Sequence, residues 1–257
     1  MNSRCASFRR RLTSGEPLVG TFIKTPSFIT AEVLSRTSLD AFCIDTEHAP
    51  FGRLELDQCI AAFRAADQPS IVRVASHSPT DIRNALDSGA TGILVPHVNS
   101  ASEAEAIVKA AQFGEGGRGY AGSPRAADYT GKSMAEHLAD SREQTTVIVQ
   151  VEDLAALENV AAIAATDVDA LFVGRADLAV AMGKAVSDRA VVDAVRKICD
   201  EAFAAGTAVG MFTPDISELP MWLDAGASLF LLSSDQSMLI AGGDALAEKF
   251  REAQRSN

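Results

Sequence analysis

Eight apolar, β-prone runs recur along this chain of 257 residues, and segments with helical periodicity separate them. The runs are apolar throughout instead of alternating with polar residues, which is typical of strands in a sheet that is covered on both faces. They span Leu18–Lys24, Ala41–Glu47, Ser70–Ala75, Gly92–Val98, Val147–Glu152, Ala170–Val173, Ala208–Phe212 and Ser228–Leu232. Eight such alternations in about 250 residues predict an α/β fold, a single (β/α)8 TIM barrel.

The segments between the runs support the same fold. Apolar residues recur there at i, i+3, i+4 and i+7, as on the buried face of a helix. Three segments end at glycines suited to a left-handed helix end: Gly89, Gly206 and Gly226. The rival fold, a doubly wound sheet that binds a dinucleotide, needs a G-x-G-x-x-G turn after the first strand, and Gly20–Lys24 does not provide one. No linker or charge block divides the sequence, so we expect one barrel domain over residues 1–257.

Composition excludes several classes of partner. The net charge is −11 and the basic residues cluster only at Arg9-Arg10-Arg11, so we expect no nucleic acid or anionic membrane partner. No apolar run approaches the ~18 residues needed to span a bilayer, and no signal-peptide pattern precedes the first strand. The four cysteines show no C-x-x-C spacing, which fits a reduced compartment. We therefore expect a cytoplasmic protein.

The second apolar run ends in three ionisable residues. Asp45, Glu47 and His48 follow the buried stretch Ala41–Ile44, and Pro50 ends the segment. A strand that is buried on both faces cannot bury unpaired ionisable groups cheaply. In a parallel barrel the carboxyl ends of the strands converge on one mouth, where such enzymes keep their chemistry. The run therefore predicts the edge of an active site.

Two carboxylates follow other strands of the predicted barrel. Glu152 ends the fifth run, and Asp177 follows the sixth within Gly174-Arg175-Ala176-Asp177. Two acids on adjacent strands, with waters and substrate oxygens completing an octahedron, suit Mg²⁺ or Mn²⁺. The alternative is that each acid caps the helix that follows its strand. The pair is our candidate metal site.

Two hydrogen-bond donors join these acids at the mouth. Arg73 lies in an otherwise apolar run, and its guanidinium suits a substrate carboxylate or, alternatively, an ion pair with Glu47. Gln150 lies two residues before Glu152 and so on the same face of the strand. It can donate to a substrate oxygen or be a satisfied amide of the barrel interior.

His48 is the natural general base of this set, because an unperturbed imidazole titrates near neutrality. The imidazole needs an orienting acid, which Asp45 or Asp87 can supply. The alternative is a structural histidine. The remaining histidines have no comparable company in the sequence, and we expect them to be structural: His77, His97 and His137.

Lys24 is the one lysine at a predicted strand end, and a Schiff-base aldolase needs a desolvated lysine in the barrel mouth. It precedes Thr25-Pro26, where we expect it to lie at a solvated rim, so this mechanism is disfavoured. A phosphate substrate is also disfavoured, because the loops after the last two strands lack the glycines of a phosphate cup.

The longest connection, Gly114–Thr145, interrupts the regular alternation of strands and helices and is rich in glycine. Long loops in compact domains are more often functional than idle. This one also contains Arg118 and Arg125. We expect it to form a lid or an edge of the active site; the alternative is a surface excursion that packs on a neighbouring subunit.

Taken together, these residues resemble the HpcH/HpaI family of class II, metal-dependent pyruvate aldolases, whose members include enzymes of the 4-hydroxy-2-oxoheptanedioate and 2-dehydro-3-deoxyglucarate aldolase type. The resemblance extends from about Gly20 to Asp235. It rests on motifs at successive strand ends: Ile44–Pro50, Val72–Val74, Leu94–Pro96, Arg118-Gly119, Val149–Glu152 and Phe172–Leu178. It implies a (β/α)8 barrel whose last helix is exchanged between subunits, commonly in a homohexamer.

The resemblance also implies roles for the residues at the mouth. Glu152 and Asp177 would ligate Mg²⁺, Mn²⁺ or Co²⁺, which also chelates the substrate. Arg73 would polarise the keto oxygen, with Gln150 nearby. His48, oriented by Asp45 and with Asp87 close, would be the base through a metal-bound water. The remaining substrate contacts would come from Phe22 and from the backbone of Gly174, Arg175 and Ala176.

The reaction that the resemblance implies is reversible cleavage of a 4-hydroxy-2-oxo acid to pyruvate, or a related 2-oxo acid, and an aldehyde. The metal and Arg73 would both place positive charge where enolate charge develops. Arg175 departs from the family, in which a proline is common at this position. It adds a cation beside the carboxylate pocket or one that points outward, and leaves the aldehyde partner undetermined.

Two other functions compete with this one. A citrate-forming or acyl-CoA-cleaving relative would use the same enolate site, although CoA would need a basic patch that this acidic chain does not display. A catalytically silent barrel would act as a binding or assembly protein. The set His48, Arg73, Glu152 and Asp177 argues against the silent barrel.

Overall fold

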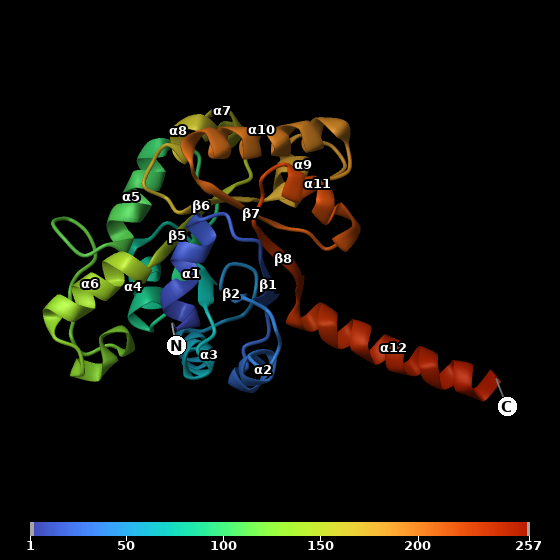
Figure 1. The fold of residues 1–257 in the computed structure, drawn as a ribbon, viewed down its shortest axis with the longest axis horizontal. Coiled ribbons are helices and arrows are strands. Elements are labelled where there is room, and N and C mark those ends of the chain that lie inside the picture. Colours follow the sequence, from blue (N-terminus) through green and yellow to red (C-terminus); the bar gives the residue numbers. More distant parts are fainter. Residues whose placement is uncertain (1–2, 256–257) are drawn as a thin grey trace.

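The structure is a computed structural model that describes residues 3–255. Eight parallel strands follow one another around a closed barrel, in which β1 pairs with both β2 and β8 (Figure 1). The strands are β1 Leu18–Ile23, β2 Ala41–Asp45, β3 Ser70–Arg73, β4 Gly92–Val95, β5 Thr146–Val151, β6 Ala170–Val173, β7 Ala208–Phe212 and β8 Leu229–Ser234. The predicted (β/α)8 barrel is confirmed.

Alternate residues of each strand enter two separate cores. In β2, Ala41 and Cys43 belong to the cluster inside the barrel, whereas Phe42 and Ile44 pack against the helices outside it. Side chains alternate across a strand with a period of two. Asp45, the next residue in the inward series, therefore follows Ala41 and Cys43 toward the barrel interior.

Helices cover the outside of the barrel between most of the strands. They are α2 Phe28–Leu34, α3 Arg53–Ala65, α4 Pro79–Asp87, α5 Ala101–Ala111, α7 Leu154–Glu158, α8 Val160–Ala164, α10 Arg189–Ala205 and α11 Leu219–Asp224, the last preceded by the short turn η2 Ile216–Glu218. The predicted glycine ends are confirmed, since Gly89, Gly206 and Gly226 all have positive φ.

The N-terminal helix, α1 Arg4–Thr13, was not predicted. Its residues Phe8 and Leu12 are fully buried and belong to the same cluster as Leu18 and Ala41 inside the barrel. Because Leu18 and Ala41 begin their strands, α1 closes the amino end of the barrel. The carboxyl end is left as the open mouth.

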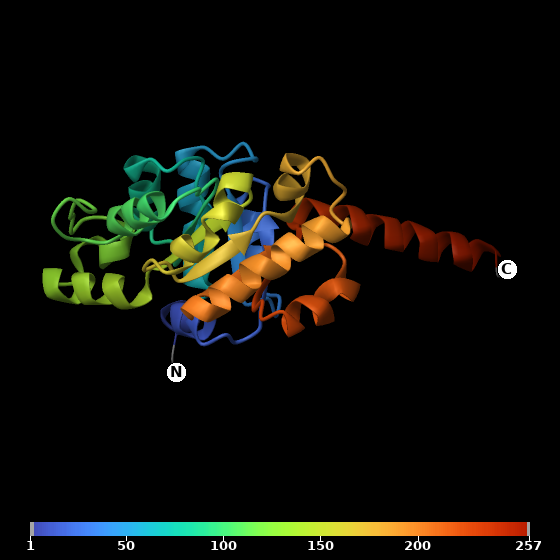
Figure 2. The same cartoon turned by 90° about the horizontal axis from the view of Figure 1, so that it is seen from above.

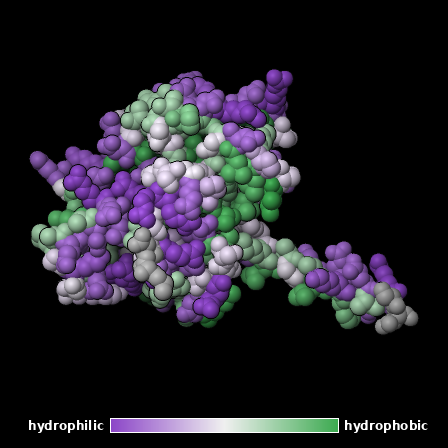
Figure 3. All heavy atoms as spheres, in the orientation of Figure 1, coloured by the Kyte–Doolittle hydropathy of each residue, from purple (hydrophilic) through white to green (hydrophobic). Residues whose placement is uncertain are grey.

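The last helix, α12 Asp235–Arg255, projects away from the barrel (Figures 1 and 2). Its apolar residues are mostly exposed, among them Leu239, Ile240, Leu246 and Phe250. Hydrophobic residues also gather on the barrel surface where α12 leaves it (Figure 3). Despite its length, α12 is not apolar enough to cross a membrane, and neither is any other helix within residues 3–255.

The long connection Gly114–Thr145 lies at the amino end of the barrel and forms the turn η1 Arg125–Thr130 and the helix α6 Met134–Gln144. In a barrel of this kind a helix returns antiparallel to its strand, so a segment between the end of α5 and the start of β5 lies opposite the mouth. Arg118 contacts Asp87 at the end of α4, and Arg125 contacts Asp57 of α3. The expected lid over the active site is therefore wrong for this chain.

Candidate active site

The carboxyl ends of the strands enclose a cavity of about 350 Å³ at the mouth of the barrel. It is bordered by most of the side chains that the sequence predicts for the site: Phe22, Arg73, Gln150, Gly174, Arg175, Ala176 and Asp177. Glu152 lies directly behind Gly174, as described below. The parallel strands thus gather residues that are far apart in the sequence.

A buried ion pair between Asp45 and Arg73 forms one wall of the mouth. Arg73 donates from Nε to Oδ1 at 3.0 Å and from Nη2 to Oδ2 at 2.7 Å, and Asp45 is fully buried. Burial alone would raise the pKa of Asp45, but the hydrogen bonds and charge of Arg73 outweigh it and leave that pKa lowered. The guanidinium also lies 4.8 Å from the ring centre of Phe22. Arg73 is therefore held in one position.

His48 lies at the edge of the mouth with its side chain 58% exposed. Asp45 does not contact the imidazole; instead its Oδ1 accepts the backbone N–H of His48 at 3.1 Å and that of Glu47 at 3.2 Å. The acid next to the ring is Glu47, with Oε2 3.7 Å from Nε2. The prediction that Asp45 orients the imidazole is corrected, because the short turn after β2 turns the backbone of His48, not its ring, toward Asp45.

Asp87 is not brought to His48 in this chain. It is the last residue of α4, at the amino end of the barrel, and its Oδ1 accepts hydrogen bonds from Nε and Nη2 of Arg118. A residue at the end of the helix that follows β3 lies opposite the mouth. The expected proximity of Asp87 to His48 is therefore corrected for the single chain.

Glu152 is a buried acid whose negative charge is only partly balanced by its hydrogen-bond donors. Oε1 accepts the backbone N–H of His97 at 2.8 Å, and Oε2 accepts a hydrogen bond from Nε2 of Gln150. Burial, together with the negative charges of Asp177 and Glu47, raises the pKa of Glu152 to about 7, although His97 works in the other direction. A carboxylate in such surroundings is stabilised by an added cation.

Gly174 makes this arrangement possible. A Cβ at this position would lie 2.5 Å from Oε2 of Glu152 and 2.9 Å from Nε2 of Gln150. Only glycine lets the start of α9 Arg175–Ala181 approach β5 so closely. Asp177, in the first turn of α9, is thereby brought near enough to Glu152 to raise its pKa.

These residues fit a divalent cation of the magnesium type. Within residues 3–255 no cluster of three or more His, Cys, Asp or Glu side chains is arranged to hold a metal by itself. Magnesium usually takes one or two protein carboxylates and completes its shell with water and substrate oxygens. The excess negative charge at Glu152, Asp177 and Glu47 is the observation that supports a cation here.

Arg175 is buried in the wall of the cavity and does not point outward. Its Nη1 donates to Oε2 of Glu218 at 2.5 Å, and its guanidinium lies 4.8 Å from the ring centre of Trp222. Nε of Arg175 is buried with no hydrogen-bond partner in the described part of the chain. Arg175 thus links the loop after β6 to the loop after β7.

The sequence profile of the HpcH/HpaI aldolase/citrate lyase family matches residues 18–241. The chain belongs to this family. The resemblance expected from the strand-end motifs is thereby confirmed, and the match includes every residue of the mouth described above.

Curated relatives within the HpcH/HpaI family align over nearly the whole chain. A 4-hydroxy-2-oxovalerate aldolase of Rhodococcus jostii is 35% identical, with 100% of both chains covered. A hydroxypyruvate/pyruvate aldolase of Paraburkholderia phytofirmans is 35% identical over 93% of this chain and 96% of its own. A 5-keto-4-deoxy-D-glucarate aldolase of Salmonella arizonae is 32% identical over 95% and 96%.

Solved structures agree with this placement. An HpcH/HpaI aldolase/citrate lyase family protein from Burkholderia cenocepacia superposes with a TM-score of 0.89 at 34% identity and covers 96% of this chain and 99% of its own. The citrate synthase SbnG superposes with a TM-score of 0.85 at 26% identity, covering 97% and 99%.

One residue at the mouth of this HpcH/HpaI chain was not predicted to be part of the site. His97 was expected to be structural, yet its Nδ1 lies 3.2 Å from Oε1 of Glu152 and 3.1 Å from Oδ2 of Asp153, and its Nε2 lies 3.8 Å from Oε1 of Glu47. Burial lowers the pKa of His97, but Asp153, Glu152 and Glu47 reverse the effect and raise it. The signal was its position near the end of the fourth apolar run, Gly92–Val98, two residues past the end of β4.

Lys24 is the second misjudged residue. Its side chain is 32% exposed, and its Nζ lies 3.5 Å from Oδ2 of Asp45, not at a freely solvated rim. The buried carboxylate of Asp235 accepts the backbone N–H groups of Lys24 and Thr25 and fixes this segment. This link could not be predicted from the sequence, because Asp235 is more than 200 residues away from Lys24 along the chain.

Proposed function

We propose that this HpcH/HpaI chain is a class II, divalent-metal-dependent aldolase. It would cleave a 4-hydroxy-2-oxo acid reversibly to pyruvate, or a related 2-oxo acid, and an aldehyde. The observation that supports this most directly is the convergence of Arg73, Gln150 and Asp177 at one cavity, with Glu152 bound to Gln150 beside it. Relatives at 32–35% identity that carry aldolase names support the same reaction class.

Glu152 and Asp177 would hold the metal, and Mg²⁺, Mn²⁺ and Co²⁺ are the candidates. When bound, the ion supplies Lewis-acid stabilisation of the 2-oxo group. The chain's own contribution is a pair of carboxylates, Glu152 directly after β5 and Asp177 in the first turn of α9, which Gly174 allows to approach each other. The remaining positions would be left to water and substrate.

Arg73 would stabilise the negative charge that develops on the keto oxygen. Asp45 holds its Nε and one edge of Nη2, so the other guanidinium donors remain for a substrate oxygen. The fixed position of Arg73 is the useful property, because a preorganised donor needs no reorganisation during the reaction. Gln150, which is bound to Glu152, would add a donor on the neighbouring strand.

Cleavage requires removal of the proton from the 4-hydroxyl group. The C3–C4 bond then breaks, its electron pair enters the enolate, and protonation at C3 yields pyruvate. His48 is the proposed base, because it borders the open side of the mouth beside Glu47. Asp87 is proposed as its assisting acid only on the strength of the family resemblance, since it lies elsewhere in the single chain.

The substrate carboxylate would bind at the backbone of residues 174–176. Arg175 holds that segment in place through Glu218 and Trp222. Phe22 would pack against the substrate from the side of Arg73.

The decisive experiment follows exchange of the methyl protons of pyruvate in D₂O by NMR. Exchange that needs Mg²⁺ or Mn²⁺ and is lost in His48→Ala and Glu152→Ala supports the proposal. No exchange with any metal refutes it. Trapping with borohydride in the presence of pyruvate would instead reveal a Schiff base at Lys24.

A citrate-forming reaction is the second candidate, since SbnG, a citrate synthase, shares the fold over 97% of this chain. Both reactions pass through an enolate, so pyruvate exchange does not separate them. Incubation with a 4-hydroxy-2-oxo acid does: release of pyruvate supports the aldolase, whereas citrate formation from an acyl donor and oxaloacetate supports the alternative.

We also propose that the protein is a homohexamer in which α12 is exchanged between subunits. The exposed apolar residues of α12, together with Phe28, Ile29 and Val33 on the surface of α2, support an exchange of this kind. Light scattering measures the mass directly. Leu246→Glu on α12 should lower it, whereas a monomeric wild-type protein would refute the exchange.

A further inference from the structure

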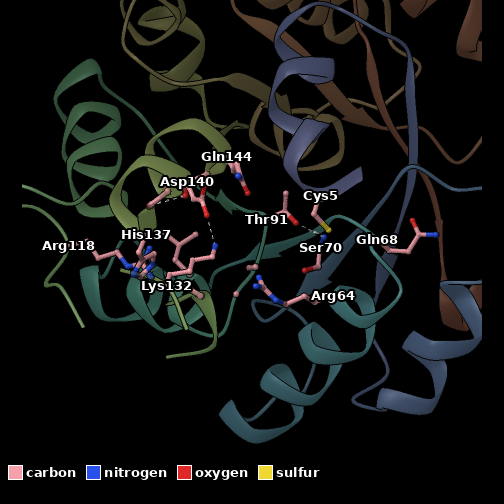
Figure 4. A pocket seen from close by; sticks show the side chains of 16 residues that line it. Cys5, Arg64, Gln68, Ser70, Thr91, Arg118, Lys132, His137, Asp140 and Gln144 are labelled. Carbon is pink, nitrogen blue, oxygen red and sulfur yellow. Dashed lines mark hydrogen bonds and ion pairs between the residues drawn. The ribbon is translucent and has the colours of Figure 1, made fainter. Parts of the chain in front are cut away.

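A second cavity, of about 80 Å³, lies at the amino end of the barrel, opposite the mouth. Figure 4 shows the side chains that line it, from α1, α3, α6 and the loops that lead into β3, β4 and β5. The long connection Gly114–Thr145 supplies Arg118, Lys132 and His137. The long connection therefore forms one wall of this cavity, although it lies far from the active site.

Basic side chains dominate the charge around this cavity. Figure 4 shows Arg64 and Lys132 reaching into the same space from opposite sides. Arg64 has no carboxylate within 4 Å among residues 3–255, whereas Lys132 binds Asp140 at 2.6 Å. A Cβ on Gly89 would lie 3.4 Å from Nη1 of Arg64 and 3.6 Å from the side chain of Arg125. The two arginines therefore both approach the backbone at Gly89, from α3 and from the long connection.

Arg118 is the most buried of these cations, with its side chain 2% exposed. Both of its bonds go to a single oxygen of Asp87, whereas a guanidinium carries five N–H donors. Burial lowers the pKa of Arg118 in spite of Asp87, and Arg83 adds to the effect. The charge of this arginine is therefore only partly compensated.

His137 gives an independent sign that this cavity receives a ligand. It is 2% exposed, lines the cavity, and has a buried Nδ1 with no partner in the described part of the chain. Its ring packs against both Phe113 and Tyr120, which also contact each other. Buried polar groups without a partner are rare and point to an unseen partner.

We propose that this amino-end pocket binds a small multivalent oxyanion, such as phosphate or a short dicarboxylate. Arg64 supplies unpaired positive charge, Arg118 and Lys132 supply the N–H donors that Asp87 and Asp140 leave free, and Nδ1 of His137 supplies a neutral hydrogen bond. The volume is several times the 10–15 Å³ that roughly one water needs, so a small ion fits and a nucleotide does not. The bound anion links α3 to the long connection and so holds that segment against the barrel.

The test is calorimetric titration of the full-length protein, without added metal, with sodium phosphate and with sodium malonate. We expect one site per chain for at least one of the two anions. Arg64→Met should weaken binding by about tenfold or more, because a charge-assisted pair is lost. Arg64 is exposed and unpaired within the described residues, so the variant is expected to fold, and Lys132→Met provides a second variant.

Two matched variants locate the site. Arg189→Met removes a cation that is 94% exposed on α10 and should leave the affinity unchanged. Arg73→Met removes the main cation of the mouth, and binding should survive it. The proposal fails if neither anion binds at about 10 mM, if Arg189→Met weakens binding as much as Arg64→Met, or if an Arg73→Met protein that urea unfolding shows to be folded no longer binds.

Discussion

The two ends of the barrel differ in the sign of their excess charge. At the mouth, the negative charges of Asp177 and Glu47 add to the effect of burial and raise the pKa of Glu152, and Arg73 is already paired with Asp45. At the amino end, Arg64 has no carboxylate partner within the described chain. The charge of Arg118 is only partly balanced by its carboxylate partner. The overall charge of −11 gives no hint of this division. Local geometry decides which kind of ligand each end attracts.

The ends also differ in how each arginine is held. Arg73 uses both oxygens of a fully buried aspartate. Arg118 binds one oxygen of Asp87, which is 23% exposed. A pair that uses both oxygens of a buried carboxylate is rigid, whereas an arginine bound to one oxygen of a partly exposed carboxylate keeps donors that a ligand can share. At the mouth, Arg73 is held in a fixed position for the substrate. At the amino end, Arg118 keeps donors that can bind the proposed anion.

The largest effect should come from removing the negative charge at the mouth. Glu152→Gln should reduce metal-dependent pyruvate exchange by at least about 100-fold, because Lewis-acid stabilisation is worth several kcal/mol and each 1.36 kcal/mol is tenfold in rate. Exchange in D₂O measures it. Glu158→Gln, at an exposed acid on α7, is the matched control. Equal rates in the two variants would remove the mouth from the mechanism.

Breaking the rigid pair should damage both catalysis and stability. Arg73→Met removes the donor at the enolate oxygen and leaves the buried Asp45 without its main cationic partner, which costs about 3–5 kcal/mol of unfolding free energy. Urea unfolding measures the stability and pyruvate exchange measures the activity. Arg73→Lys should recover part of the stability and little of the activity, since an ammonium cannot bind both oxygens as a fork. Full activity in Arg73→Lys would contradict the positioning argument.

Breaking the looser pair should cost less. Arg118→Met leaves Asp87 partly open to water, so we expect a loss of about 1–2 kcal/mol in unfolding free energy. The same urea experiment, run beside Arg73→Met, tests the contrast directly. A larger loss for Arg118→Met than for Arg73→Met would reverse the assignment of the rigid and the loose end.

The smallest effect should be a pH dependence that belongs to the amino end. Burial, with Arg118 and Lys132 nearby, lowers the pKa of His137 below its ordinary value of 6.5. The unfolded chain therefore binds the proton first, so His137 should make the protein less stable as the pH falls below about 6.5. His137→Phe should flatten this part of a stability curve measured by urea unfolding. An unchanged curve would show that other groups cause the dependence.

The fold was accessible from the sequence because the pattern of burial is local. Strand β6 and helix α10 match their predicted bounds, since continuous apolar runs and a 3.6-residue period report burial directly. The predicted helix over Ala155–Ala164 is instead two short helices that meet at Asn159. Helices α1 and α6 were not predicted, because most of their residues are polar and only a few, such as Phe8 and His137, are buried.

The candidate site was accessible only in part. The strand ends identified Arg73, Gln150 and Glu152, because barrel topology converts sequence position into spatial position. The contacts among side chains were not accessible. Asp45 binds Arg73 instead of the His48 ring, and Lys24 is fixed by Asp235, a residue more than 200 positions away. Partners of this kind depend on side-chain rotamers and loop conformations, which produce no periodic pattern in the sequence.

The chain contains a single tryptophan, Trp222, which is fully buried and stacked on Arg175 in the wall of the mouth. The quantum yield and wavelength of indole emission respond to a neighbouring charge. Ligands that shift Arg175 therefore change an optical signal that is native to the protein, and no label has to be attached. Anions at the opposite end of the barrel leave that signal unchanged, so one fluorimeter trace can tell which end a ligand has entered.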